Sequence, residues 1–573
     1  MYFKELAEYL EKLEGTNSRL EMTRILARLF AETTPEEARL VAYMTQGKLG
    51  PAYRSPDFGV ADKMMIRALG GEAERIFKKT GDLGKTVEEI KSQKSKGKST
   101  AQNLKVKEVY EKLREIAEAG GEGSQERKIQ LVGDLLDSLG GRSAKYAVKM
   151  ILGKLRTGFS DMTVLDALSW MIGGDKKLRP AIERMYNVRA DLGEIAEKIK
   201  NQKSKGKNTI QNLKVEPGLG TPVLMARAER AKDAVEIWTR LGECAAEYKL
   251  DGLRIQAHVR KSQIVLFSRG LENVTSMYPD VVEGLAKQIK HECIVEGEMI
   301  AVGKTGKFLP FQETVQRKRK YQITEMAGKI PLTIYVFDLL WANGANWANK
   351  AYLERRKMLE ELTKMGRTVK LMPMEKIETE EEIERFFKRA VDDGCEGIIA
   401  KKLDGEYAAG ARNFNWIKYK KSYDKSNLAD TIDAVVMGYD AGQGKRAGFG
   451  IGDFLIGVYD SKADRYLTAA KIGTGLTDEE WRELRSKVQD SRSNKKPENY
   501  EVTKQMECDF WVGPKYVVEI KADEITRSPM HTSGLALRFP RFVGWREKKP
   551  EEATSLTELK RLYTMQGNTP LPR

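Results

Sequence analysis

The chain of 573 residues is poor in the residue types on which several common kinds of site depend. It contains 3 histidines and 4 cysteines, and no two cysteines form a CxxC pair. The sequence therefore offers few residues from which a His-based triad, a zinc knuckle or a disulfide framework could be built. No apolar run approaches the roughly 18 residues of a membrane span, and the opening segment MYFKELAEYLEKLEG carries charges where a secretory signal needs its apolar core. We therefore expect a cytoplasmic protein without membrane contact, whose chemistry rests on Lys, Arg and carboxylates.

Charge is abundant and unbalanced. Lys and Arg number 99 against 83 Asp and Glu, which gives a formal net charge of +16. Such an excess favours a polyanionic partner, nucleic acid first, although a Lys-rich solvated surface has the same composition. Hydrophobic residues make up 41% and charged residues 32%, as in globular proteins. At this length the chain should form roughly three or four domains.

Residues 1–220 show the three- and four-residue apolar spacing of amphipathic helices, which predicts an all-α domain. The segment DLGKTVEEIKSQKSKGKSTAQNLKV from Asp82 returns as DLGEIAEKIKNQKSKGKNTIQNLKV from Asp191, and QGKLGPAYRSPDFGVADKMMIRAL is echoed by LGKLRTGFSDMTVLDAL. This internal duplication predicts a curved helical module with loops on related faces, suited to binding a nucleic-acid backbone. A solenoid that binds protein remains the alternative.

The remaining chain changes character at EPGLGTPV, where Gly and Pro cluster and a domain boundary is predicted. From 221 to 424, short segments rich in Ile, Val, Phe and Tyr alternate with helical patterns, which predicts an α+β domain. From 425 to 573, short strands with Gly-rich connections predict a small β barrel. The fold class is therefore multidomain, with an all-α, an α+β and a β domain in that order.

The stretch EYKLDGLRIQAH places Lys249 inside a strand-like segment, followed at once by Asp251, Gly252 and Arg254. A lysine becomes a nucleophile when desolvation or neighbouring cations lower its pKa, and Arg254 and the strand NWIKYKK offer such cations. A lone lysine at the end of a strand is more often plain surface charge. The stretch therefore predicts a reactive lysine only if other motifs accompany it.

Those motifs follow in order. KxDGxR at Lys249 resembles the adenylylated-lysine motif of the covalent nucleotidyltransferases, which comprise DNA ligases, RNA ligases and capping enzymes. SRG, VEGEMIA, YVFDLLW, EGIIAKK and NWIKYKK then match the other motifs of that superfamily. Further on, SGLALRFPRFVGWREKKPEEAT resembles the motif that closes the oligonucleotide-binding (OB) barrel of ATP-dependent DNA ligases of the archaeal and eukaryotic replicative type. With the helical N-terminal part, the resemblance covers nearly the whole chain.

The resemblance implies a helical DNA-binding domain at 1–220, an adenylation (nucleotidyltransferase) domain at 221–424 and an OB-fold domain at 425–573. It implies that Lys249 attacks ATP and carries AMP, which then passes to the 5′-phosphate of a nick in double-stranded DNA. The cofactors would be ATP and Mg²⁺, with Mn²⁺ as a substitute. The implied nucleotide-binding residues are Glu247, Arg254, Arg269, Glu298, Phe337, Arg412 and Lys418, and the implied metal ligands are Glu298 and Glu396.

The resemblance also implies a monomer that acts in DNA replication, repair, recombination and cell division, with the sliding clamp as a partner. The segment QNLKV lacks the paired aromatics that a clamp peptide inserts, so no residues are assigned to that contact. The barrel motif departs from the family, because Arg546-Glu547-Lys548-Lys549 stands where Arg-Glu-Asp-Lys is usual, which leaves open which lysine serves the pyrophosphate. A hinge is expected near Ser422 to Ser426.

Two other interpretations remain open at this stage. An RNA ligase or a capping-type guanylyltransferase shares the lysine motif but would not be expected to carry both the duplicated helices and LRFPRF. A DNA-binding scaffold without catalysis would have helical repeats and a barrel, but the intact lysine motif argues against it. Strict use of ATP over NAD, ADP or GTP is not decided by the sequence.

Overall fold

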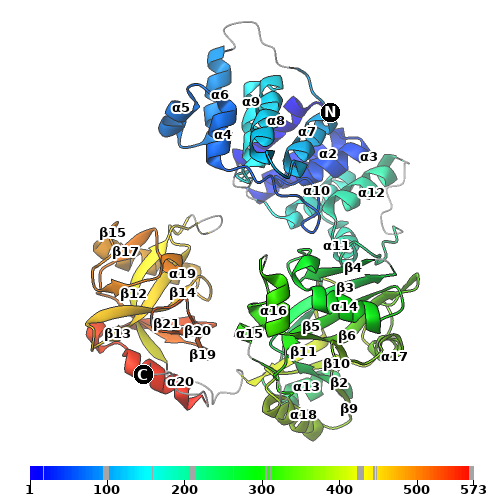
Figure 1. The fold of residues 1–573 in the computed structure, drawn as a ribbon, viewed down its shortest axis with the longest axis vertical. Coiled ribbons are helices and arrows are strands. Elements are labelled where there is room, and N and C mark those ends of the chain that lie inside the picture. The colour runs from blue at the N-terminus through cyan, green and yellow to red at the C-terminus, as the bar shows by residue number, and fades with distance from the viewer. Residues whose placement is uncertain are drawn as a thin grey trace. The chain divides into compact units, whose positions relative to one another are not determined.

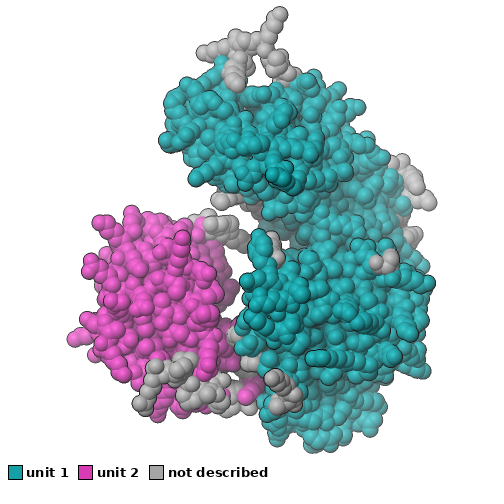
Figure 2. All heavy atoms as spheres, viewed as in Figure 1, with its two compact units in different colours: residues 1–230, 237–418 teal, residues 231–236, 419–573 magenta. Residues whose placement is uncertain are grey.

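The computed structural model divides the chain into two compact units. Residues 1–230 and 237–418 form the first unit, and residues 231–236 and 419–573 form the second (Figure 2). The expected hinge at Ser422 to Ser426 lies outside the described residues, as does most of the Lys/Ser/Gly-rich tail of each repeat. The structure describes the whole chain except residues 17, 95–101, 156, 158, 205–212, 262, 304–305, 310, 320, 422–430, 443–445, 447 and 567–573.

Residues 1–204 fold almost entirely into helices, as the apolar spacing predicts (Figure 1). In the first helix, α1 (Phe3–Glu14), apolar side chains three or four residues apart are all buried, namely Phe3, Leu6, Leu10 and Leu13. Among the helices that the structure describes, none has the length and apolar character that a membrane crossing requires. The helices are α1 (Phe3–Glu14), α2 (Arg19–Glu32), α3 (Pro35–Met44), α4 (Asp62–Leu69), α5 (Ala73–Thr80), α6 (Leu83–Lys94), α7 (Val106–Glu118), α8 (Ser124–Ser138), α9 (Gly141–Ile151), α10 (Asp161–Gly173), α11 (Arg179–Val188) and α12 (Leu192–Ser204).

The sequence repeat is also a repeat of local structure. Asp82 and Asp191, which begin the two copies of the DLG segment, each accept a hydrogen bond on a side-chain oxygen from a backbone N–H in the first turn of the following helix. The donors are the amides of Lys85 and Glu194, both at 2.9 Å. A carboxylate at this position satisfies one of the amides that a helix leaves unpaired at its N-terminus. Helices α6 and α12 therefore start in the same way in both copies.

The two copies interlock rather than stack end to end. The last helix of each copy packs on the third helix of the other, so that α6 lies against α9 and α12 lies against α3 (Figure 1). Likewise α2 packs on α10, and α4 packs on α8. One continuous core holds apolar side chains from both copies. The helical domain is therefore a single interdigitated body, which differs from the chain of stacked units found in a solenoid.

The region from 227 to 420 contains two sheets, and strands form where the sequence predicts them. The first sheet has the order β1-β11-β10-β2-β9 and the second β4-β3-β5-β6-β7, with β8 beside β6. Helices α14 (Pro279–Gln288) and α17 (Tyr352–Leu362) pack on the second sheet, and α18 (Glu380–Asp392) on the first. The other bounds are β1 (Arg227–Arg230), α13 (Ala234–Leu241), β2 (Cys244–Lys249), β3 (Leu253–Arg260), β4 (Gln263–Ser268), β5 (Cys293–Ala301), α15 (Phe311–Val315), α16 (Ile323–Lys329), β6 (Leu332–Ala342), β7 (Ala345–Asn346), β8 (Val369–Leu371), β9 (Met374–Ile377), β10 (Gly397–Lys402) and β11 (Arg412–Lys420).

The C-terminal region is rich in strands, as predicted. Its larger sheet has the order β15-β17-β12-β13-β14-β16, with β18 bridging β12 and β21, and β19 pairs with β20. The strands are β12 (Ile432–Asp440), β13 (Asp453–Asp460), β14 (Arg465–Ile472), β15 (Arg492–Ser493), β16 (Tyr500–Glu501), β17 (Phe510–Val512), β18 (Val517–Lys521), β19 (Glu524–Arg527), β20 (Leu535–Arg538) and β21 (Arg541–Arg546), with helices α19 (Asp478–Val488) and α20 (Leu556–Met565).

The cations of the barrel motif differ in their surroundings. Arg541 forms an ion pair with Asp523, and the amino group of Lys548 lies 2.7 Å from Asp433. The amino group of Lys549 has no ion-pair partner among the residues that the structure describes. Lys548 and Lys549 are therefore distinguishable by charge pairing, although adjacent in sequence.

The interlocking of the copies gives a stability prediction at Gly193, the second residue of α12. A Cβ at this position would collide with the ring of Tyr43, which comes from the other copy and is itself hydrogen-bonded to Asp191. Gly193→Ala should therefore lower the free energy of unfolding by about 1–3 kcal/mol, as overpacking does. Urea unfolding followed by circular dichroism measures the change.

Gly84, which occupies the same place in the first copy, provides the matched control. A Cβ there would lie 3.0 Å from Asp82 Oδ1 and 3.1 Å from two carbons of the Lys149 side chain, which is a milder contact than the collision at Gly193. Gly84→Ala should therefore lower the free energy of unfolding less than Gly193→Ala does. An equal loss in both variants would mean that the tight contact between the copies has no special effect on stability.

Candidate active site

Lys249 lies at the end of β2 and is joined there to the start of β10. The two strands are antiparallel with Lys249 opposite Gly397, and the backbone N–H of Glu396 donates to the Lys249 carbonyl at 2.9 Å. This pairing brings the Glu396 side chain to the lysine, and Lys249 Nζ lies 2.6 Å from Glu396 Oε2. Two motifs that are far apart in sequence thus meet at one end of the first sheet.

The turn after Lys249 leads from the first sheet into the second. Gly252 lies so close to Met299 that a Cβ on it would collide with the Met299 carbonyl oxygen. Only glycine allows this approach, which explains why the motif has glycine here. Strand β3 begins immediately afterwards and carries Arg254.

Candidate residues from five of the six motifs, together with Arg412, line one pocket with a volume of about 180 Å³. Strands β2, β3, β5, β6 and β11 contribute to its wall, as does the residue that follows β4. Glu396 does not line this pocket but reaches it through its ion pair with Lys249. The predicted residues in the wall are Glu247, Lys249, Arg254, Arg269, Glu298, Phe337, Arg412 and Lys418.

The electrostatic surroundings of Lys249 differ from the expected cluster of cations. Burial alone would lower the pKa of Lys249, but the charges of Glu396, Glu298 and Asp251 outweigh it and raise the pKa above its ordinary value. In this state the amine is therefore an ammonium, which must lose a proton before it can attack. The expectation that neighbouring cations lower the pKa of Lys249 is wrong, because its charged neighbours are mainly carboxylates.

The carboxylates near Lys249 fit a magnesium site. Burial raises the pKa of Glu298 to about 7, and Glu396 and Asp251 add to the effect, while Lys249 and Arg254 oppose it. Within the described ranges no group of three or more His, Cys, Asp or Glu side chains forms a ready metal cage. Mg²⁺, however, commonly takes one or two carboxylates together with water and substrate phosphates. Glu298 and Glu396 provide this donor set.

Arg254 and Phe337 form a layered wall. The Arg254 guanidinium lies 5.4 Å from the ring centres of both Phe337 and Trp416, and its Nη2 is 2.6 Å from Glu296 Oε2. Its Nη1 donates to the Ala226 carbonyl at 2.8 Å. The buried Nε has no hydrogen-bond partner among the described residues, so one donor of this guanidinium remains available for a ligand.

Comparison with known proteins agrees with this geometry. The family model described as "ATP dependent DNA ligase domain" matches residues 225–420, "DNA ligase N terminus" matches 2–169, and "ATP dependent DNA ligase C terminal region" matches 447–549. A protein of Dictyoglomus turgidum named "Probable DNA ligase" is 43% identical, and the alignment covers 98% of this chain and 97% of that one. The chain belongs to the family of ATP-dependent DNA ligases.

A second relative supports the assignment, and one solved structure has a similar fold. The DNA ligase of Sulfolobus acidocaldarius is 39% identical, with 98% of each chain covered. The solved structure described as "Pmar-Lig_PreS3" covers 95% of this chain and 99% of its own, with a TM-score of 0.54 and 17% identity, which shows a similar fold. The ligase therefore seals nicks in DNA in an ATP-dependent reaction.

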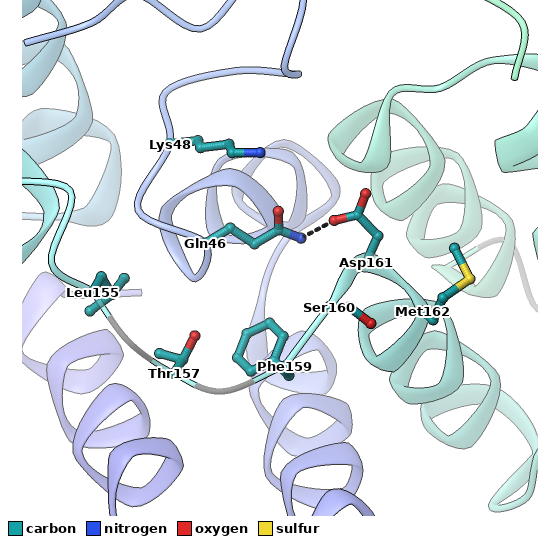
Figure 3. A pocket seen from close by; sticks show the side chains of 8 residues that line it. All are labelled: Gln46, Lys48, Leu155, Thr157, Phe159, Ser160, Asp161 and Met162. Atoms are coloured by element: carbon teal, nitrogen blue, oxygen red, sulfur yellow. Dashed lines mark hydrogen bonds between the residues drawn. The ribbon is translucent and has the colours of Figure 1, made fainter. Parts of the chain in front are cut away.

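A second hollow of the ligase lies between the two echoing loops of the helical domain (Figure 3). Gln46 and Lys48 follow α3 on one side. On the other side the lining residues come from the segment before α10 and from its first two residues, namely Leu155, Thr157, Phe159, Ser160, Asp161 and Met162. The Gln46 side-chain amide donates to Asp161 at 2.8 Å and ties the two loops together (Figure 3). The repeat thus places related loops next to each other.

Sequence reasoning missed Lys401, a fully buried cation on β10 that is part of the pocket wall. Its amino group lies 2.7 Å from Glu247 and 3.7 Å from Asp338, donates to the Phe337 carbonyl, and lies 4.3 Å from the Trp416 ring centre. The available signal was a lysine within the apolar strand GIIAKK, but burial could not be read from the sequence. Lys401 holds Glu247 and the Phe337 backbone in place.

Removing the positive charge of Lys401 should destabilise the ligase strongly. Lys401→Met would leave Glu247 and Asp338 buried with less compensation, which typically costs about 3–5 kcal/mol. Chemical unfolding should show this loss. Lys402→Met is the matched control, since the Lys402 side chain is 47% exposed and Asp404 is its ion-pair partner among the described residues. A Lys401→Met variant as stable as the control would contradict the role of the buried charge.

Proposed function

We propose that Lys249 is the residue of this ligase that becomes adenylylated. Its Nζ attacks the α-phosphorus of ATP, a nitrogen–phosphorus bond forms, the bond to the bridging oxygen breaks, and pyrophosphate leaves. AMP then passes to the 5′-phosphate of a nick, and the adjacent 3′-hydroxyl displaces it. The observation that supports this role is the position of Lys249 in the wall of a pocket that also contains Arg254, Arg269 and Lys418.

The same contacts determine whether the Lys249 amine is protonated. Glu396, which lies 2.6 Å from Nζ, and Glu298 both raise the pKa of Lys249, whereas burial lowers it. We propose that Glu298 and Glu396 hold Mg²⁺, for which Mn²⁺ can substitute, and that this ion neutralises phosphate charge. With the two carboxylates engaged, burial would dominate and the neutral amine would be favoured.

The other residues of the wall have complementary roles in this proposal. The exposed cations Arg269 and Arg412 and the half-buried Lys418 provide charge for phosphate and ribose oxygens. The face of Phe337 would stack on the adenine base, with Arg254 beside it. Glu247, held by Lys401, would accept a hydrogen bond from the base.

The domain assignment is part of the proposal. We propose a helical DNA-binding domain at 1–220, an adenylation domain at 221–424 and an OB-fold domain at 425–573, which is supported by family models that match three separate stretches. A monomer that acts in replication, repair and recombination, with the sliding clamp as partner, is what the family implies.

The nucleophile is tested by substitution. Lys249→Ala and Lys249→Arg should both abolish the covalent AMP adduct, because an always-protonated guanidinium cannot attack phosphorus. Intact-protein mass spectrometry after incubation with ATP and Mg²⁺ measures the adduct. Lys402→Ala, which changes an exposed lysine on β10, should retain it. An adduct on either Lys249 variant would disprove the assignment.

The DNA-binding role of the helical domain is tested at its repeat-related lysines. Lys48 is exposed and has no ion-pair partner among the described residues, whereas Lys154, at the equivalent place in the second copy, lies 2.7 Å from Asp62. A free lysine that contacts a phosphate releases a counterion on binding. Lys48→Ala should therefore weaken binding of nicked DNA and reduce the slope of log affinity against log salt by about 1.

Lys154→Ala is the matched control and should have a smaller effect, because Asp62 already neutralises this lysine. Fluorescence anisotropy with a labelled nicked duplex across a salt titration gives both slopes. Equal slopes for the wild-type ligase and the Lys48 variant would exclude Lys48 as a phosphate contact.

A further inference from the structure

Strand β3 carries a row of polar side chains on the face that contains Arg254. Arg254, Gln256 and His258 alternate along the strand, and Gln256 and His258 are buried. This row faces the segment 220–226, which leads from the helical domain to β1. A fully buried glutamine is unusual unless all of its polar atoms are satisfied.

Gln256 satisfies this condition by pairing with backbone. Its Nε2 donates to the Val223 carbonyl at 3.0 Å, and its Oε1 accepts from the Val223 N–H at 2.9 Å. The second hydrogen of Nε2 is directed to Glu296 Oε1 at 3.1 Å. Gln256 therefore joins segment 220–226 to the carboxylate that pairs with Arg254.

The neighbouring histidine fixes the direction of these hydrogen bonds. The Gly220 N–H donates to His258 Nδ1 at 3.0 Å, so Nδ1 must be the unprotonated nitrogen. Nε2 then carries the hydrogen and donates to Gln256 Oε1 at 2.9 Å. Burial, with nearby Arg side chains, lowers the pKa of His258 to about 3 and keeps it neutral. One continuous chain of donors thus runs from Gly220 through His258 and Gln256 to Glu296.

Segment 220–226 is itself anchored on the helical domain. The Leu224 N–H donates to the Asn187 carbonyl at 2.7 Å, and the Ala190 N–H donates to the Pro222 carbonyl at 3.0 Å. The segment ends at Ala226, whose carbonyl accepts from Arg254 and which also lines the nucleotide pocket. Gln256 therefore contacts one acceptor of Arg254, Glu296, directly. Through Val223 it holds the segment that carries the other acceptor, the Ala226 carbonyl. The Ala226 N–H in turn donates to the Tyr407 hydroxyl at 2.8 Å.

We propose that Gln256 is a positioning residue for nucleotide binding, which acts on Arg254 by fixing Glu296 and segment 220–226. The inference rests on the proposed function, in which Arg254 contacts the nucleotide. A guanidinium with both acceptors fixed is pre-oriented for the ligand, and loss of either acceptor lets it rotate away. Gln256 itself is not required for the chemical step.

The test is a double-mutant cycle on self-adenylylation, with ATP concentration varied and adduct formation followed by mass spectrometry. Gln256→Met keeps the size and shape of the side chain but removes its hydrogen bonds. We expect it to raise the ATP concentration for half-maximal rate roughly tenfold and to leave the maximal rate nearly unchanged. In an Arg254→Ala background the same substitution should have little further effect, because Gln256 acts through Arg254.

Two further variants separate positioning from stability. Thr314→Val removes a buried hydroxyl that accepts from the Ala301 N–H, and it should lower stability without changing the ATP dependence. His258→Leu removes the hydrogen bonds of His258 to Gly220 and Gln256, one step further from Arg254 than Gln256 is. This substitution should raise the half-maximal ATP concentration by roughly threefold. It also provides a second measurement if Gln256→Met does not fold.

The experiment distinguishes failure of the positioning role of Gln256 from failure of the proposed role of Lys249. If the wild-type ligase forms the adduct on Lys249 and Gln256→Met has the same ATP dependence, the positioning role is overturned alone. Independent, additive effects of Gln256→Met and Arg254→Ala would also overturn it, because they would indicate a general structural role. Absence of the adduct in the wild-type ligase would instead count against the proposed function.

Discussion

The ion pair between Lys249 and Glu396 lies where β2 passes into β3, and the pocket is built around that crossing. The backbone hydrogen bond between the two residues fixes both side chains at one end of the first sheet. Because Gly252 allows the turn to pass against Met299, β3 can start at once and bring Arg254 into the same pocket. The positions of Lys249, its carboxylate partner Glu396 and Arg254 therefore depend on one turn and one strand pairing.

A network of buried charged side chains lies along one wall of this pocket and extends away from it. Lys401 stands between Glu247 and Asp338, and Asp338 pairs with Arg355 at 2.7 Å, so charges alternate in sign. Taking ions out of water is costly, and such a network adds little net stability over apolar packing. We infer that its value is geometric: the charges permit one arrangement of Glu247 and of the Phe337 backbone, and hence one shape of the pocket.

Much of the architecture could be predicted from the sequence, because it depends on local pattern. Short segments rich in Ile, Val, Phe and Tyr marked strands of both sheets, and the motifs identified most of the candidate residues that line the pocket. The repeat was also recognisable in the sequence, but similarity between two segments does not predict which face of one packs on which face of the other. The interlocking of α6 with α9 and of α12 with α3 therefore appeared only in the structure.

The features that escaped prediction share a physical cause. Lys401 and Gln256 are polar residues in strands, and whether such a residue is buried depends on pairing with segments far away in sequence. The pKa of Lys249 illustrates the same limit, since the local motif offered Arg254 while the structure supplied Glu396 and Glu298 from other strands. Composition and spacing identify candidate charges, but the sign of a pKa shift is set by the three-dimensional neighbours.

The stretch from EPGLGTPV to Ala226 (residues 216–226) is both a predicted domain boundary and part of the pocket wall. Gly and Pro mark it as a connection, yet Val223 pairs with Gln256 and the carbonyl of Ala226 holds Arg254 in the pocket wall. Because the same segment is anchored on Asn187 of the helical domain, a shift of the segment would disturb contacts at both ends. The helical domain and the pocket around Lys249 are thus joined by hydrogen bonds as well as by the chain, and the position of Arg254 depends on both.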